Sequence, residues 1–98
     1  MKSMETICGE LESVPYMKLP QARIVKNILL EYGFRNALEV VFYHGKSSVL
    51  IASVFEEAGA GHLTTFDLES SRNREPDIHQ LLDAYNLSHR VTPVFCSR

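Results

Sequence analysis

The chain has 98 residues, of which 45% are hydrophobic and 22% charged, a size and composition that suit one small globular domain rather than a disordered protein or a disulfide scaffold. The formal net charge of −2 predicts no basic face, so nucleic acid and anionic membranes are excluded as partners. Cys8 and Cys96 form no CxxC pair and indicate free thiols in a reducing compartment, with a single bridge left open. Because neither a signal peptide nor a membrane span is predicted, we expect a cytoplasmic protein.

Residues 1–19 combine scattered charge with glycine and proline, and we expect an irregular leader there. A helix is predicted over 20–32, because Pro20 suits a first helical turn and Gly33 suits the left-handed residue after the last one. Its apolar side chains recur at steps of three and four residues, as in an amphipathic helix: Ala22, Val25, Ile28, Leu29 and Tyr32.

A strand is predicted over 37–43, where the sequence is almost continuously apolar, as is typical of a strand buried on both faces. Glu39 is the one charge within it. A turn then leads into a helix that Ser47 or Ser48 could cap and that ends at Gly59.

A second strand is predicted over 62–68, followed by a polar loop over 69–75, a helix that Pro76 opens, and a third strand over 90–96. Alternating strands and helices indicate parallel strands with right-handed crossovers. We therefore expect the whole chain to form one partial α/β domain of the doubly wound, Rossmann-like, three-layer kind. Residues 20–98 would supply a helix and three parallel strands in the order 3-2-1, with helices on both faces.

Two strand ends in this arrangement could bind a ligand, because ligands of such sheets lie beyond the carboxyl ends of the strands. Gly45 follows the first strand, where its backbone could approach a ligand at a helix N-terminus. Asp67 ends the second strand, 22 residues after Gly45, a spacing seen where an acid binds ribose hydroxyls. Each also has a structural interpretation, Gly45 as a turn glycine and Asp67 as a loop cap.

Other polar residues near these strand ends are weighed in the same way. A buried Glu39 needs partners, so we expect a ligand or a cluster of backbone amides beside it. Lys46 is interpreted first as a solvated turn lysine, and Ser47 and Ser48 first as helix caps and second as ligand contacts. The histidines show no metal-ligand spacing: His44, His62, His79 and His89.

Gly45-Lys46-Ser47 matches the tail of a P-loop, but the glycine required five positions earlier is replaced by Val40. A nucleoside triphosphate-binding loop is therefore ranked low. The dinucleotide pattern GxGxxG is absent too, because the loop has a single glycine.

The stretch 37–48 resembles motif I of class I S-adenosylmethionine-dependent methyltransferases, in the branch written LExGxxxGxS. Residues 62–67 resemble that family's second strand with its ribose-binding acid, while 76–87 and 90–95 resemble its next helix and third strand. Residues 14–17 are similar to the segment before the family's first helix. The resemblance covers nearly the whole chain and depends on order and spacing rather than on one decisive motif.

The resemblance implies S-adenosylmethionine as cofactor, bound by Glu39, Tyr43, Gly45, Ser47, Ser48 and Asp67. In that interpretation Glu39 anchors motif I and Gly45 lets the backbone pass close to the cofactor. Ser47 or Ser48 offers polar contacts, and Asp67 holds the ribose hydroxyls, which a carboxylate can accept in pairs.

Two departures from the family pattern shape the expected function. The motif-I glycine falls at Val41, and the sequence stops after the third strand, where the family's acceptor side begins. We therefore expect the cofactor-binding N-terminal portion of a methyltransferase, with an unknown acceptor and no activity by itself. The alternative is a non-catalytic interaction or oligomerisation module. The outer edge of the first strand would be unpaired and apolar, which predicts self-association through it.

Overall fold

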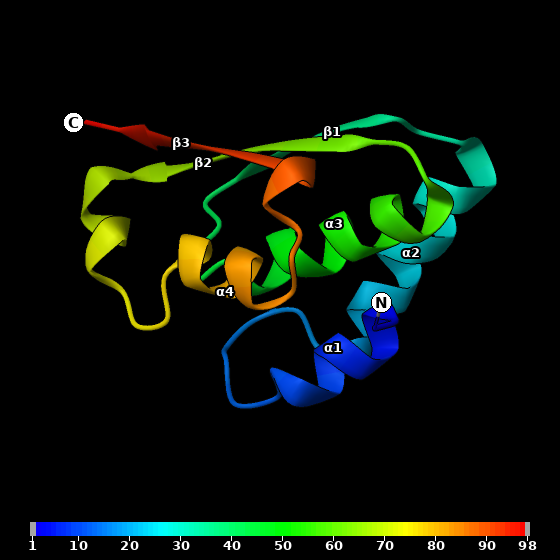
Figure 1. Cartoon of the computed structure of the whole chain (residues 1–98), viewed down its shortest axis with the longest axis horizontal. Coiled ribbons are helices and arrows are strands. Elements are labelled where there is room, and N and C mark those ends of the chain that lie inside the picture. The colour runs from blue at the N-terminus through cyan, green and yellow to red at the C-terminus, as the bar shows by residue number, and fades with distance from the viewer. Residues whose placement is uncertain (1, 98) are drawn as a thin grey trace.

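The computed structural model describes residues 2–97 and shows a small sheet with helices packed beneath it (Figure 1). In chain order the elements are α1 (Met4–Glu10), α2 (Leu19–Tyr32), β1 (Asn36–Val40), α3 (Lys46–Ala58), β2 (His62–Leu68), the 3₁₀ helix η1 (Glu69–Asn73), α4 (Ile78–Ala84), the 3₁₀ helix η2 (Ser88–Arg90) and β3 (Val91–Cys96).

The three strands are parallel and lie in the order β1-β2-β3, which confirms the predicted α/β class and strand order. In their register, Leu38 of β1 lies opposite Thr64 of β2, and Thr64 lies opposite Thr92 of β3. The carboxyl ends of the strands therefore meet at one edge, which is where Asp67 and the β1–α3 loop are found.

The helices lie on one face of the sheet (Figure 1), so the prediction of helices on both faces is wrong for residues 2–97. The reason is topological. Two right-handed crossovers that step in the same direction, β1 to β2 and β2 to β3, must place α3 and α4 on the same face.

The expectation that the first strand is buried on both faces is wrong as well. Leu38 and Val40 point to the open face and are each 68% exposed, whereas Ala37 and Glu39 lie half-buried toward the helices. The apolar run therefore predicted the strand correctly, but it did not indicate that both faces of the strand are buried.

The predicted leader contains the helix α1, which begins after Ser3, whose hydroxyl accepts a hydrogen bond from the Thr6 amide at 3.1 Å. Its buried residues Met4, Ile7 and Cys8 pack into the same core as α3. The apolar residues 4, 7, 8 and 11 have helical spacing, so the sequence does contain a pattern that indicates this helix. The segment was nevertheless predicted to be irregular, because glycine and proline lie nearby.

The core lies between the sheet and the helices and is centred on α3 and β2. Its most deeply buried side chains include Val49, Ala52, Phe55, Leu63 and Leu82. Cys8 is buried and Cys96 exposed, and both are free thiols, as expected. Among residues 2–97, none of the helices combines the length and the hydrophobicity that crossing a bilayer would need.

Candidate functional site

The loop between β1 and α3 has an unusual backbone. Val41, Tyr43 and Gly45 have φ values of 68°, 54° and 95°, all in the left-handed region. This bend ends β1 at Val40, three residues before the predicted end of the strand. Glycine enters the left-handed region freely, but a β-branched side chain there is a strained exception. Valine at position 41 therefore occupies a conformation that favours glycine.

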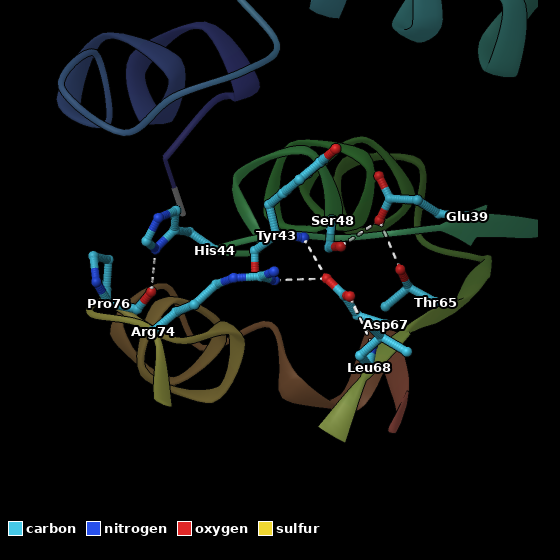
Figure 2. A network of polar contacts seen from close by, with 9 residues as sticks. All are labelled: Glu39, Tyr43, His44, Ser48, Thr65, Asp67, Leu68, Arg74 and Pro76. Atoms are coloured by element: carbon cyan, nitrogen blue, oxygen red, sulfur yellow. Dashed lines mark hydrogen bonds and ion pairs between the residues drawn. The ribbon is translucent and has the colours of Figure 1, made fainter. Parts of the chain in front are cut away.

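Below this loop, the carboxylate of Glu39 accepts hydrogen bonds from the hydroxyls of Ser47 and Ser48 on α3, and from Thr65 Oγ1 on β2 at 2.8 Å. Figure 2 shows Glu39 with two of these partners, Ser48 and Thr65, both of which are buried. The expected partners of Glu39 were a ligand or backbone amides, and the structure provides side-chain hydroxyls instead. The cluster ties β1, β2 and the first turn of α3 together.

The serines do not cap α3, contrary to the sequence prediction. The N-cap residue is Gly45, which offers no side-chain hydrogen bond to the helix. Ser47 and Ser48 lie within the first helical turn, from which their hydroxyls reach Glu39. Their hydroxyls thus donate to a carboxylate on the neighbouring strand, whereas a capping serine accepts hydrogen bonds from helix amides.

Asp67 lies at the end of β2, with a side chain only 4% exposed. Its carboxylate accepts hydrogen bonds from the Leu68 amide at 2.7 Å, the Tyr43 amide at 3.0 Å and Arg74 Nη1 at 2.6 Å. The same guanidinium nitrogen donates to the Tyr43 carbonyl at 2.8 Å, so the acid, the loop and Arg74 form one network (Figure 2).

Opposing effects act on the pKa of Asp67. Burial raises it most strongly, but the hydrogen bonds from Arg74, Leu68 and Tyr43, together with the charge of Arg74, bring the pKa below its ordinary value of 3.8. The carboxylate is therefore ionised at neutral pH, with its oxygens acting as acceptors for hydroxyl or guanidinium donors.

Gly45 is buried against α4. A Cβ atom placed on it would lie 2.7 Å from Ile78 Cγ1 and 2.9 Å from Ile78 Cα, closer than such contacts allow. Close packing with α4 therefore requires glycine here, whatever else the loop does. His44 is held in the same region, with Nδ1 2.8 Å from the Pro76 carbonyl oxygen (Figure 2).

Lys46 is buried, and its ammonium group donates to the carbonyl of Val14 at 3.2 Å. The prediction of a solvated turn lysine is therefore wrong. The side chain turns toward the segment between α1 and α2, and its ammonium group binds the backbone there. The ammonium group therefore does not face a phosphate site at the strand ends, which further weakens the P-loop alternative.

The six predicted site residues all lie close to the carboxyl ends of β1 and β2. Five of them form two groups: Glu39 with Ser47 and Ser48, and Tyr43 with Asp67. The sixth, Gly45, packs against Ile78 of α4 instead. Sequence reasoning missed Thr65, which a register with residue 39 could have revealed. It also missed Arg74 and Tyr16; the Tyr16 ring stacks on Tyr43 with centroids 4.4 Å apart.

Two surface hollows lie away from this network. One borders α1, α3 and α4 and includes Lys2, Glu56 and Tyr85. The other lies between α1 and α2, with Cys8 and Lys46 in its wall. Residues 2–97 contain no group of three or more histidine, cysteine, aspartate or glutamate side chains placed to hold a metal ion.

No protein-family model matches the chain, and no curated protein is significantly similar to it. Solved structures do match. A Staphylococcus aureus protein assigned as a caffeoyl-CoA O-methyltransferase has a TM-score of 0.74 and 22% identity over 98% of this chain. The Podospora anserina methyltransferase PaMTH1, with S-adenosylhomocysteine bound, has a TM-score of 0.75 and 10% identity over 98% of this chain. A Bacillus cereus O-methyltransferase, also in complex with S-adenosylhomocysteine, has a TM-score of 0.67 and 19% identity over 94% of this chain.

The chain covers 44%, 42% and 42% of those three proteins, so it corresponds to less than half of each. At these identities the likeness establishes fold. It confirms the resemblance seen in the sequence at that level: the chain has part of the Rossmann-like α/β fold of class I S-adenosylmethionine-dependent methyltransferases.

Proposed function

We propose that the chain is the cofactor-binding portion of a class I methyltransferase and that it binds S-adenosylmethionine at the carboxyl ends of β1 and β2. The observation that carries the proposal is the bond from the Tyr43 amide to the buried carboxylate of Asp67. It joins the loop after β1 and the acid after β2 into one polar site at the place where ligands of such sheets bind. Two of the similar structures, PaMTH1 and the Bacillus cereus enzyme, contain S-adenosylhomocysteine.

Asp67 would accept the ribose hydroxyls of the cofactor. A carboxylate oxygen offers about two acceptor positions. Oδ1 accepts only from the Leu68 amide, whereas Oδ2 accepts from both Tyr43 and Arg74. One hydroxyl would thus bind at the free position on Oδ1, and the other would replace Arg74. The Arg74 side chain is 29% exposed, so its guanidinium group can turn into solvent when displaced.

The remaining predicted residues would shape the loop and its helix. Glu39, Ser47 and Ser48 hold the first turn of α3 against β1. The amides of that turn favour a negatively charged group, such as the carboxylate of the cofactor's methionine part. Tyr43 and Gly45 would contribute backbone close to the cofactor, since both lie in the loop between β1 and α3 at the strand ends.

Methyl transfer would proceed by in-line displacement at the cofactor's sulfonium, a reaction in which positioning supplies most of the catalysis. The polar groups of this network bond to one another, and none is assigned a role as general base. The proposed contribution of this chain is therefore cofactor binding, while the methyl acceptor and the groups around it would come from outside these residues.

Titration calorimetry with S-adenosylhomocysteine tests the proposal, with ATP–Mg²⁺ titrated in parallel. We expect the first ligand to bind and Asp67→Asn to weaken it by about 10- to 100-fold, since hydrogen bonds to a charged group contribute about 1.5–3 kcal/mol. Glu31→Gln, an exposed acid on α2, is the matched control and should bind like the wild type. Equal affinity of the Asp67 and Glu31 variants would contradict the proposed site.

A non-catalytic module is the second candidate, and Val41 is the observation that favours it. Its side chain is 39% exposed at the site, where the family motif has glycine. If the wild type binds neither ligand at millimolar concentration while remaining folded, the module becomes the better interpretation. Binding of ATP–Mg²⁺ alone would favour the phosphate-loop alternative instead.

A further inference from the structure

Exposed apolar side chains gather in one part of the molecule. Among residues 2–97, the large hydrophobic side chains classed as exposed all fall between Tyr16 and Tyr43, in α2, β1 and the adjoining loops. Those on α2, β1 and the turn between them are Ile24, Ile28, Leu30, Tyr32, Phe34, Leu38 and Val40. A concentration of this kind marks a contact surface.

The outer edge of β1 adds unpaired backbone groups to this surface. The Val41 amide donates to the Phe66 carbonyl at 2.6 Å, and the Arg35 carbonyl accepts from the His62 amide at 2.9 Å. Odd-numbered positions of β1 thus face β2. The amides and carbonyls of the alternate residues Asn36, Leu38 and Val40 therefore point away from the sheet. No strand within residues 2–97 pairs with them.

We propose that a second copy of the chain binds here, with its β1 antiparallel to this β1 about a twofold axis at Leu38. The two sheets would then form one continuous sheet. A twofold axis requires a self-complementary strand. Leu38 would face Leu38 of the second copy, Asn36 would face Val40, and Ala37 would face Glu39. No like charges would be opposed, and Glu39 already has hydroxyl partners.

The available area suits a dimer. Leu38 and Val40 are each 68% exposed, Tyr32 is 67% exposed, and the Tyr32 and Phe34 rings stack just before β1. Leu38 and Val40 would gain cross-strand contacts on the open face. The exposed side chains of α2 and the turn after it would supply the remaining area, on the order of 100 Å² each, toward the roughly 800 Å² per partner of a stable interface.

The opposite edge of the sheet does not offer the same opportunity. β3 contains Pro93, which has no amide hydrogen, although its pairing with β2 continues on both sides of that residue. The missing donor therefore belongs to the outer edge, where proline discourages pairing with another strand. The proposed pairing is thus specific to β1.

Sedimentation velocity from about 10 to 300 µM, a range that covers micromolar dissociation constants, tests the proposal. We expect a dimer that Leu38→Lys converts to a monomer, because a charged side chain on an edge strand opposes pairing. Thr92→Lys is the matched control, since Thr92 lies in the same row of the sheet on β3 and is exposed. A monomeric wild type, or equal effects of both lysines, would overturn the proposal.

Disulfide trapping checks the register independently of the lysine variants. In a Cys8→Ala, Cys96→Ser background, Leu38→Cys should form a covalent dimer, because facing Cα atoms in such a pair are about 5.5 Å apart, within disulfide reach. Val40→Cys should cross-link far less, since it faces Asn36. Equal yields at both positions would refute this register. Neither measurement depends on cofactor binding.

Discussion

β1 and β3 are the two edges of one small sheet, and they differ in how they meet solvent. β3 carries Pro93, and the Arg72 guanidinium lies 3.7 Å from the ring centre of Phe95. β1 has no proline, and it exposes Leu38 and Val40. Natural edge strands carry devices that discourage pairing, and proline, which removes a backbone donor, is present in β3 but not in β1. The difference indicates that β3 ends the sheet, whereas β1 is a surface on which another strand can add.

The largest expected effect in this comparison comes from removing the hydrogen bonds that Glu39 of β1 accepts from α3 and β2. Glu39→Ala would leave the buried hydroxyls of Ser48 and Thr65 without their acceptor. We expect a loss of about 2–3 kcal/mol in the free energy of unfolding, the usual cost of unsatisfied buried groups. Urea denaturation measures it. Glu39→Gln keeps one acceptor oxygen and should lose less; Thr92→Ala on β3 should change stability by less than about 0.5 kcal/mol. Equal losses of unfolding free energy for Glu39→Ala and Thr92→Ala would show that β1 does not depend on the Glu39 hydrogen bonds.

A smaller effect, of opposite sign, is expected at the end of β1. A valine in the left-handed region costs about 1–2 kcal/mol, whereas glycine's extra unfolded-state entropy costs about 0.5–1 kcal/mol. Val41→Gly should therefore raise the free energy of unfolding by up to about 1.5 kcal/mol. It should also strengthen S-adenosylhomocysteine binding in calorimetry, by removing a side chain from the site. A destabilised variant with weaker binding would show that the valine packs favourably there.

The smallest expected effect concerns β3. Pro93→Thr restores an amide hydrogen on the outer edge, and it should produce species larger than a dimer at high concentration. The change is clearest in a Leu38→Lys background, where β1 no longer pairs and any new association must use another surface. Sedimentation velocity detects it. If the double variant remains monomeric, Pro93 is not what protects β3.

The sequence predicted the strands and long helices of this fold well, because their apolar periods are clear. The second strand was expected over 62–68, which matches β2, and the third over 90–96, within one residue of β3. The first strand ends earlier than expected because the left-handed residue Val41 follows it. Positive φ at a valine has no signature in composition or period, so a sequence pattern could not reveal it.

The candidate site was predicted in part for a similar reason. Glu39 and Asp67 stood out as acids at the ends of apolar strands, and the structure places both among several donors. Arg74 lies in a polar loop whose composition resembles any solvated segment, so its bond to Asp67 needed coordinates. Lys46 was misjudged because nothing in the neighbouring sequence indicates that a distant carbonyl, that of Val14, accepts a hydrogen bond from its ammonium group.

That last contact changes how the beginning of the chain should be regarded. The ammonium group of Lys46 is buried beneath residues 11–18, and Met4, Ile7 and Leu11 lie in the core beside α3. A protein shortened to start at Leu19 would open a hydrophobic hollow and expose a cation that now has a carbonyl partner. Residues 2–18 thus cover the side of the domain opposite the sheet, and the loop at the strand ends depends on them for its support.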